Sequence, residues 1–463
     1  MRESDCQHGR GTACRAPTFK KFFFFLFLLA GFVCAYNFPA GAEDSAEIFI
    51  PIVGPSKLVL NSNPSYINDH TVFQAEDGKW HLIGITHHKV LGGKLPVPWA
   101  EEEFIHAVTP ALEGPWTVLP PILQIDRKLG ETHVWAPHVV KRDGQYYCFY
   151  AAGGGHWTSM INLAQSSDAM TWRRYPGNPL FRDFYDARDP MALRDGDRWI
   201  LYYTKTFSRE ERRSTVAYRT SNDLVHWSEP GFAYMVRSLP ATLPNSQYTE
   251  SPFVVQYRGL YYLFMCTPDL GYQATRVFVS KDPFNFSEAD EITTLIAHCA
   301  EVVKDGERYY LTHAGWYFDG LYLADLTWRP AGKFSPAMRF ANSGDNDDYL
   351  VSAGGAKKIR WGLAGQHALE AGAGQVIEYA FPVPEGVRGI RVVFESSGKY
   401  RIKVNGEAAP DSMEAGLGDS TLHAFDLDEV SLWSSGQLDL RFEDSGASAK
   451  DRLKLAYVKV YIF

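Results

Sequence analysis

One unit recurs five times along this chain, and such a repeat constrains the fold more strongly than any other feature. Each copy has a turn dipeptide, an aromatic strand, a second strand, and then a polar turn that often carries a tryptophan. The five turns are Asp77-Gly78, Asp143-Gly144, Asp195-Gly196, Arg258-Gly259 and Asp305-Gly306. Asp-Gly between aromatic and β-branched residues is a strong hairpin signal, because a tight primed turn needs positive φ. Each copy therefore predicts a four-stranded antiparallel sheet.

Five such sheets in series predict an all-β protein whose N-terminal part is a five-bladed β-propeller around a central channel. A flat sandwich would explain the strands, but it would not explain five similar copies in a row. The aromatic fraction of 14% agrees with a fold rich in strands. We place this domain at residues 43–338.

The sequence pattern changes after about residue 340. Strands without the repeated signature follow, and alternation is clear in Leu438–Phe442. About a hundred residues of this kind predict a C-terminal β-sandwich at residues 339–463. This second domain either binds carbohydrate or braces the propeller, and the sequence leaves both roles open.

The N-terminus has the features of a secretory signal peptide. Lys20 and Lys21 precede the apolar run 22–33, and Ala40-Gly41-Ala42 supplies small residues for cleavage. A membrane anchor is the alternative, but the apolar run is short for a full span. We expect residues 1–42 to be removed and the mature protein to be secreted, extracellular or periplasmic, with no stable membrane span.

Charge and cysteine content narrow the range of partners and of folds. The formal net charge is −8 and no basic run occurs, which makes the chain a poor binder of nucleic acid. Beyond the signal peptide, Cys148, Cys266 and Cys299 are too few for a disulfide scaffold. One bridge between Cys266 and Cys299 stays open.

Three acidic residues precede three of the hairpins at similar distances. Asp69, Asp189 and Glu250 each enter an apolar strand directly. The first strand of each blade lines the channel of a propeller, so we expect the three carboxylates to converge at one mouth. An isolated buried charge is costly, so each acid must be paired, hydrated or functional. Pairing with Arg188 would explain Asp189 alone, but not three acids in register.

Three neighbouring carboxylates would perturb one another's pKa values. Hydrolysis of a glycosidic bond needs one protonated carboxyl to donate to the leaving oxygen and one ionised carboxylate to act as base or nucleophile. A third carboxylate could keep the pKa of the donor high by repulsion between like charges.

The motifs around these acids resemble those of a known group of enzymes. They are Asn68-Asp69, similar to the start of an Asn-Asp-Pro-Asn motif, Trp135-Ala136-Pro137, similar to a Trp-Ala-Pro strand, Arg188-Asp189-Pro190, similar to an Arg-Asp-Pro motif, and Glu250-Ser251-Pro252, similar to a Glu-Gly-Pro or Glu-Cys-Pro motif. Together, over residues 60–330, they resemble the clan of glycoside hydrolase families 43, 32 and 68. His70 stands where the fructan-cleaving members have proline, so the resemblance is nearest to family 43.

The resemblance implies roles for the three acids. Asp69 becomes the base or nucleophile, Asp189 the stabiliser and pKa modulator, and Glu250 the general acid with a raised pKa. The function implied is a secreted glycoside hydrolase acting on poly- or oligosaccharides that contain arabinose, xylose or related furanosides. The alternatives are a retaining family 32-like β-fructosidase and a non-catalytic carbohydrate-binding propeller.

Four further residues are candidates for substrate binding. Trp135 is either a stacking platform for the sugar or a core tryptophan. Arg188 either contacts substrate or orients Asp189, and His70 lies next to Asp69. A histidine placed like His298 often helps to hold a central metal in family 43, while a structural histidine is equally consistent. No metal-ligand spacing is visible. We therefore assign no metal ligands and no required cofactor, and leave a structural Ca²⁺ in the channel open.

Overall fold

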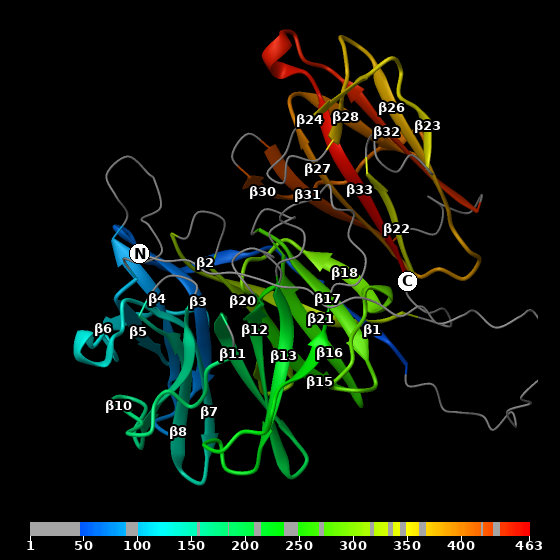
Figure 1. The fold of residues 1–463 in the computed structure, drawn as a ribbon. Helices are drawn as coiled ribbons and strands as arrows, with labels where there is room; N and C mark the ends of the chain where they lie inside the picture. Colours follow the sequence, from blue (N-terminus) through cyan, green and yellow to red (C-terminus); the bar gives the residue numbers. More distant parts are fainter. Residues whose placement is uncertain are drawn as a thin grey trace, which may run out of the picture. The chain divides into compact units, whose positions relative to one another are not determined.

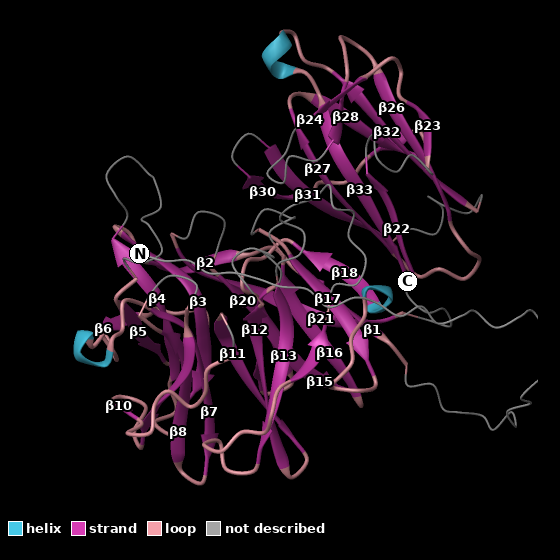
Figure 2. Ribbon diagram, viewed as in Figure 1, coloured by secondary structure: helices cyan, strands magenta, loops and turns pink. Residues whose placement is uncertain are grey.

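The computed structural model describes residues 47–88, 101–154, 158–183, 185–207, 214–235, 249–267, 273–314, 319–331, 337–342, 349–360, 367–417, 420–428 and 436–463. Over these ranges the chain is built from strands with three short 3-10 turns, η2 (Arg127–Leu129), η4 (Glu288–Asp290) and η6 (Ala449–Asp451), which confirms the all-β prediction (Figure 2). No helix in the described part is long and apolar enough to cross a membrane. The predicted signal peptide, residues 1–42, lies outside the described residues.

Four antiparallel sheets of four strands follow one another along the chain. The first contains β3 (Ser65–Gln74), β4 (Trp80–His88), β5 (Glu103–Thr109) and β6 (Thr117–Leu119). The second contains β7 (Val134–Arg142), β8 (Gln145–Ala152), β9 (Met160–Ser166) and β10 (Arg173–Arg174). The third contains β11 (Asp186–Asp195), β12 (Arg198–Thr206), β13 (Ser214–Ser221) and β14 (Gly231–Tyr234). The fourth contains β15 (Glu250–Tyr257), β16 (Leu260–Cys266), β17 (Thr275–Ser280) and β18 (Glu291–Leu295).

The fifth sheet joins two distant parts of the chain. It contains β19 (Glu301–Asp305), β20 (Arg308–His313) and β21 (Gly320–Pro330), together with β1 (Phe49–Val53) and β2 (Lys57–Asn61). Both N-terminal strands pair antiparallel with β21, and Phe49 lies opposite Pro330 (Figure 1). The fifth repeat therefore takes its outer strands from the start of the region rather than from the residues that follow it.

The five predicted hairpins are confirmed. Each turn dipeptide joins the first strand of a sheet to the second, as in the pairing of Asp195 with Arg198. The turn glycines have positive φ, for example 78° at Gly78, a region of backbone space that side chains disfavour. The repeat seen in the sequence is thus one repeated supersecondary unit.

The five sheets close into a ring. The first strand of each sheet packs beside that of the next, in the order β3, β7, β11, β15, β19 and back to β3. A separate hydrophobic cluster fills the space between each pair of neighbouring sheets; Ile67 and Val303, for example, belong to the cluster that joins the first sheet to the fifth. Apolar burial between sheets therefore holds all five first strands around one axis.

Two further sheets follow in the C-terminal part. The larger contains β22 (Ala337–Asn342), β24 (Lys357–Arg360), β25 (His367–Glu370), β27 (Ile390–Ser397), β30 (Met413–Leu417), β31 (Ser420–Leu427) and β33 (Lys454–Ile462). The smaller contains β23 (Leu350–Ser352), β26 (Val376–Pro382), β28 (Tyr400–Val404), β29 (Glu407–Ala408) and β32 (Gln437–Asp444). Side chains of both sheets, such as Phe394 and Phe442, share one core. The strand expected from the alternation in Leu438–Phe442 forms as part of β32.

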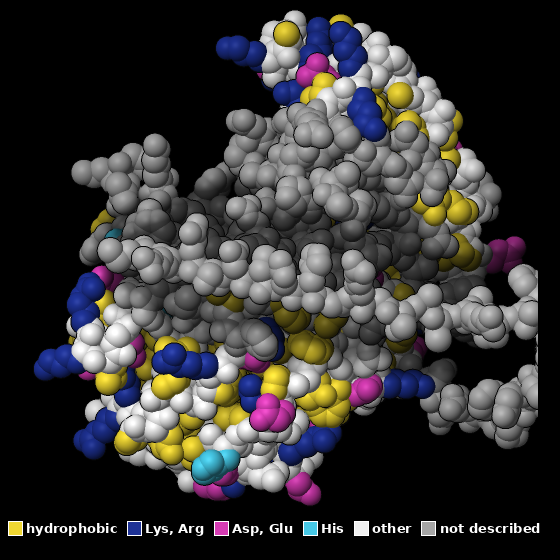
Figure 3. All heavy atoms as spheres, viewed as in Figure 1, with side chains coloured by type: hydrophobic (Ala, Val, Ile, Leu, Met, Phe, Trp, Pro, Cys, Tyr) yellow, Lys and Arg dark blue, Asp and Glu magenta, His cyan; other side chains and the backbone are white. Residues whose placement is uncertain are grey.

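Both signs of charge occur on the described surface drawn in Figure 3. Acidic side chains lie among basic ones on its lower part, with hydrophobic side chains between them. On that part of this face, the net charge of −8 is therefore not gathered into one acidic patch.

A buried charge network joins the fourth sheet to β33. Glu291 on β18 has a fully buried side chain, and it pairs with Arg276 on β17 and with Lys459 at 3.4 Å. The Tyr461 hydroxyl donates to Glu291 Oε1 at 2.6 Å. Although burial alone would raise it, these partners lower the pKa of Glu291 from 4.5 to about 2. Glu291 is thus a buried anion held by two cations from different sheets.

We expect Glu291→Gln to lower the free energy of unfolding at pH 7 by about 3 kcal/mol, because it leaves buried cations without their anion. A carboxylate with a depressed pKa stabilises the fold above its unfolded pKa, and this contribution is lost as the pH falls. The difference between wild type and variant should therefore shrink between about pH 4.5 and pH 2. Urea unfolding at a series of pH values measures it.

Asp428 provides a control, because it pairs with Arg329 but has a side chain that is 58% exposed. Asp428→Asn should cost less than about 1 kcal/mol, as exposed pairs do. Equal losses of unfolding free energy from the two variants would contradict the expectation that the buried Glu291 network stabilises the fold more than an exposed ion pair does.

Candidate active site

Four of the five first strands of the ring carry an irregularity at the same point. In β3, β7, β11 and β15, two residues lie opposite a single residue of the second strand, which is a β-bulge. The bulge pairs are Asn68-Asp69, Ala136-Pro137, Asp189-Pro190 and Ser251-Pro252, and Cys299-Ala300 occupies the same place just before β19. Proline cannot donate to the ladder and is tolerated at bulges, which explains why three of the pairs end in it.

The three acids occupy three consecutive positions around this bulge. Glu250 is the last residue before its bulge, Asp189 is the first residue of its bulge, and Asp69 is the second. The expectation of one shared register position is therefore wrong by one or two residues. Trp135, Arg188 and His298 share the position of Glu250, and His70 follows the bulge.

Left-handed backbone accompanies the bulges. Asp189 has a φ of 55° and Ser251 a φ of 47°, and Ala136 and Cys299 are also in this region. Non-glycine residues with positive φ cost of order 1–3 kcal/mol and cluster at functional sites. Four such residues at equivalent points show that the strain is repeated around the ring.

Arg188 lies at the centre of the acidic cluster. Its side chain is 5% exposed, and its Nη2 lies 3.3 Å from Glu250 Oε1. Its Nε lies 3.6 Å from Asp189 Oδ2, and its Nη1 donates to Asp186 Oδ2. One buried guanidinium thus contacts three carboxylates, and the predicted pairing of Arg188 with Asp189 is only one of its contacts.

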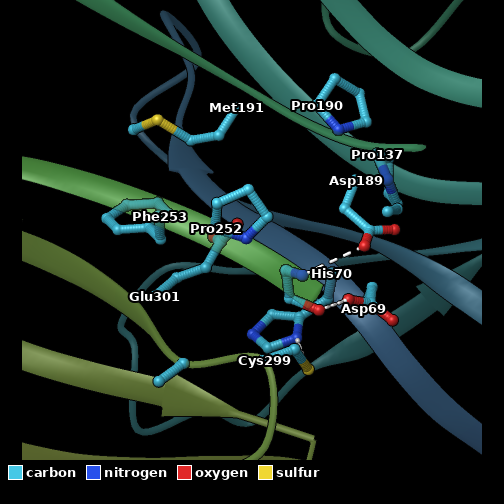
Figure 4. Close-up of a pocket in the computed structure, with 13 residues that line it drawn as sticks. Asp69, His70, Pro137, Asp189, Pro190, Met191, Pro252, Phe253, Cys299 and Glu301 are labelled. Carbon is cyan, nitrogen blue, oxygen red and sulfur yellow. Dashed lines mark hydrogen bonds between the residues drawn. The ribbon is translucent and has the colours of Figure 1, made fainter. Parts of the chain in front are cut away.

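Ser251 forms hydrogen bonds with both Asp69 and Asp189. Its backbone N–H donates to Asp189 Oδ2 at 3.1 Å, and its hydroxyl donates to Asp69 Oδ1 (dashed lines in Figure 4). The left-handed conformation of Ser251 lets one residue of β15 reach carboxylates on β11 and β3. The structure therefore brings Asp69, Asp189 and Glu250 into one cluster.

Burial raises the pKa of Asp189 from 3.8 to about 8. Arg188 opposes this shift, while the charges of Asp69 and Glu250 add to it. This differs from the predicted arrangement, in which a negative Asp189 holds the proton on Glu250. The cluster retains a proton near neutral pH, and the titration belongs to the coupled group rather than to one residue.

A cavity of about 30 Å³ lies on the ring axis beside the acids, close to the volume of one water molecule. Asp69 and Asp189 line it from one side and Glu301 from another, as Figure 4 shows. Every one of the five first strands, or the residues just before it, contributes to the lining. The bulges therefore surround one small, partly open pocket next to the carboxylates.

Trp135 lies in the core between the first and second sheets and is 8% exposed. Its ring faces that of His133, with 3.8 Å between centroids, and it does not line the cavity. This placement favours the core interpretation, and the stacking role stays a prediction.

Glu101 is a buried carboxyl that the sequence did not single out. It accepts a hydrogen bond of 2.5 Å from the Tyr66 hydroxyl. Burial and, to a smaller extent, the nearby charge of Asp69 together raise its pKa to about 8, although the hydrogen bond from Tyr66 opposes the shift. Glu101 opens the run Glu101-Glu102-Glu103, which in a sequence has the appearance of a solvated charged stretch.

The predicted histidines lie deep beside the acids. His298 Nε2 lies 2.8 Å from Asn68 Oδ1, and His70 Nε2 lies 3.0 Å from Thr312 Oγ1. Burial, with smaller contributions from the charges of His70 and His298, lowers the pKa of His313 to about 3. In the part of the chain described, no three His, Cys, Asp or Glu side chains are grouped so that they could hold a metal ion. The structural Ca²⁺ that the sequence leaves open stays a prediction.

Cys266 and Cys299 are free thiols, so the disulfide left open by the sequence does not form. The backbone N–H of Cys299 instead donates to Cys266 Sγ at 3.1 Å. Both side chains are buried, and burial raises the pKa of both thiols. They are therefore neutral packing groups beneath the acidic cluster.

Residues 115–301 match the family model of glycosyl hydrolases family 43. Asp189, Glu250 and Arg188 lie inside this stretch, and Asp69 lies before it. The predicted resemblance to a family 43 glycoside hydrolase is confirmed over this stretch.

Three other proteins are also similar to this chain. The probable arabinan endo-1,5-α-L-arabinosidase A of Aspergillus fumigatus is 25% identical over 168 residues, which are 34% of this chain and 49% of that protein. The arabinan endo-1,5-α-L-arabinosidase A of Aspergillus aculeatus is 29% identical over 110 residues, covering 22% of this chain and 34% of that protein. The chain thus spans about half the length of the first relative and about a third of the second. The crystal structure of a family 32 β-fructofuranosidase from Bombyx mori superposes with a TM-score of 0.46 at 16% identity, covering 88% of this chain and 94% of that one.

The raised pKa of Asp189 predicts a stability change with a definite sign. Between about pH 4 and pH 8 the folded chain binds more protons at this site than the unfolded chain, so stability falls as the pH rises. Asp189→Asn removes the titration and keeps an acceptor for the Ser251 N–H. We expect this variant to exceed wild type by at least about 1 kcal/mol at pH 8 and to approach it near pH 4.

Urea unfolding at pH 4, 6 and 8 checks this expectation. Asp223→Asn serves as a control of opposite sign, because hydrogen bonds from the surrounding turn hold the pKa of Asp223 low. That variant should be less stable than wild type at pH 8. An Asp189→Asn protein that is also less stable at pH 8 would contradict the raised pKa.

Proposed function

We propose that this chain is a glycoside hydrolase that cleaves chains of α-linked arabinose or related arabinose- and xylose-containing polysaccharides. The observation that carries the proposal is the cluster of Asp69, Asp189 and Glu250 around the buried Arg188. Two of these acids lie within the stretch that matches family 43. The names of the two Aspergillus relatives support arabinan as the first substrate to test.

The proposed architecture is a five-bladed β-propeller over residues 43–338 and a β-sandwich over residues 339–463. The closed order of first strands and the five inter-sheet clusters support the propeller. The common core of the two C-terminal sheets supports the sandwich. In this architecture the carboxylates lie where the innermost strands of three blades meet.

The proposed chemistry divides the work between two carboxyls. Glu250 donates a proton to the leaving glycosidic oxygen, and Asp69 acts on the opposite side as the base that activates water. The Ser251 hydroxyl holds the Asp69 carboxylate by a charge-assisted hydrogen bond. Asp189 shares a proton with Glu250 across Arg188, so the pair can supply the acid at neutral pH.

Leaving-group dependence tests these roles. Glu250→Gln should reduce cleavage of arabino-oligosaccharides by about 100-fold or more, because a poor leaving group needs the proton. Aryl arabinosides with acidic phenols should suffer much less. Asp69→Asn should damage both kinds of substrate, since it removes the attack on the anomeric carbon. Initial rates on both substrate types measure the difference.

Asp143→Asn, in a hairpin turn at the far end of β7, should leave both rates unchanged. Equal damage to both substrate types by Glu250→Gln would refute the acid assignment. Wild-type protein that binds arabinan and cleaves no glycoside would favour a non-catalytic carbohydrate-binding propeller.

We also propose that the protein is exported and cleaved after Ala42. The motif Ala40-Gly41-Ala42 behind the apolar run supports this site. Expression of the full sequence should yield exported protein whose N-terminal sequence starts at Glu43. Exported protein that still begins at Met1 would contradict the proposal.

A further inference from the structure

Asp186 is a deeper carboxylate that contacts the guanidinium at the centre of the site, in addition to Asp189 and Glu250. Its side chain is fully buried, and its Oδ2 accepts a hydrogen bond of 2.5 Å from Arg188 Nη1. The same Nη1 donates to Thr206 Oγ1 at 3.0 Å. Nη2 and Nε are left for the acids nearer the ring axis, Glu250 at 3.3 Å and Asp189 at 3.6 Å.

The position of Asp186 is itself well determined. It lies two residues before Arg188 on β11, and alternate residues of a strand share a face. Its other oxygen, Oδ1, accepts a hydrogen bond of 2.9 Å from the backbone N–H of Ser159. The Ser159 hydroxyl lies 2.9 Å from His133 Nε2. Asp186 is therefore anchored to the neighbouring sheet and cannot rotate away from Arg188 without losing a buried contact.

We propose that Asp186 is a positioning residue that holds Arg188 between Asp189 and Glu250 and balances the guanidinium charge, so that these two acids keep their shared proton. The inference rests on the proposed function, because the proton is the one that Glu250 would donate. Nothing in the predicted roles of the three acids requires this fourth carboxylate.

The charges around Asp189 and Glu250 determine how removal of the Asp186 charge would change the pKa values of these two acids. In the part of the chain that the structure describes, the titratable groups whose charges act on Asp189 and Glu250 include Arg188, Asp69 on β3 and Cys266 on β16. The Cys266 thiol is neutral, because burial raises its pKa to about 12. Arg188 is therefore the cation among these groups. Removing the anion that balances it strengthens its pull on the remaining carboxylates.

Asp186→Asn is the primary test, because asparagine keeps the shape, removes the negative charge, and has one amide oxygen that can still accept from Arg188 or from Ser159. We expect the alkaline limb of the kcat/KM profile on arabino-oligosaccharides to move to lower pH by about one unit. Above the limb this corresponds to a loss of about tenfold. KM should change little, and aryl substrates with acidic leaving groups should be less affected. Infrared titration of the carboxylic acid band should show the proton released at lower pH by a similar shift.

Asp183→Asn is the matched control. Asp183 is also buried, pairs with Lys205 at 2.7 Å and lies just before the same strand, yet it does not contact Arg188. This variant should lose stability without moving the pH limb or the infrared titration. Equal shifts from both substitutions would reduce the role of Asp186 to general stabilisation and overturn the proposal.

A double-mutant cycle tests whether Asp186 acts through Arg188. Arg188→Gln should move proton release to higher pH, and adding Asp186→Asn to it should produce no further shift. The double variant also removes both members of the buried pair, which folds tolerate better than the loss of one. A full Asp186→Asn shift in the Arg188→Gln background, or titrations of Asp186→Asn that superpose on wild type, would overturn the proposal. If wild type cleaves no glycoside, the proposed function fails, and the infrared titrations alone decide the role of Asp186.

Discussion

The positions of the candidate catalytic acids depend on the β-bulges in β3, β11 and β15. A regular strand would alternate its side chains between two faces and direct them into the hydrophobic clusters between sheets. The extra residue interrupts that alternation, so Asp69, Asp189 and the N–H of Ser251 can meet beside the ring axis. The proline that ends three of the bulges removes a ladder donor at the point where the ladder is already broken.

A second constraint is the cost of burying Asp186 and Asp189 beside the half-buried Asp69 and Glu250. Arg188 offsets that cost for Asp186, Asp189 and Glu250 together, and the remaining imbalance appears as the raised pKa of Asp189. Isolated buried charges neutralise themselves by taking up or losing a proton. A cluster with more anions than cations therefore stores a proton, which is what acid catalysis at neutral pH needs.

The hairpins could be predicted because their signals are local: a turn dipeptide between strands specifies both partners. The origin of the outer strands in the fifth sheet could not be predicted in this way. The pairing of β1 with β21 joins residues that lie far apart in the sequence. The acids were found from their spacing ahead of the hairpins, but the bulge displaced them by one or two positions. The Ala-Pro, Asp-Pro and Ser-Pro dipeptides at equivalent points of three first strands were the sequence signal for the bulges. Asp186 could have been paired with Arg188 from the alternation of strand residues, whereas Glu101 had no signal beyond an acidic run.

The pairing of β1 and β2 with β21 also governs when the protein can fold. Phe49 is made early and its partner Pro330 late, so a ribosome must synthesise all five repeats before the last sheet can be completed. Pairings between residues so far apart close slowly, since the entropy of the intervening loop is lost before the contact forms. The nascent chain therefore remains incompletely folded through most of its synthesis. Until residue 330 of the 463 has been made, such a polypeptide lacks the closed ring that would resist passage through a narrow translocation pore.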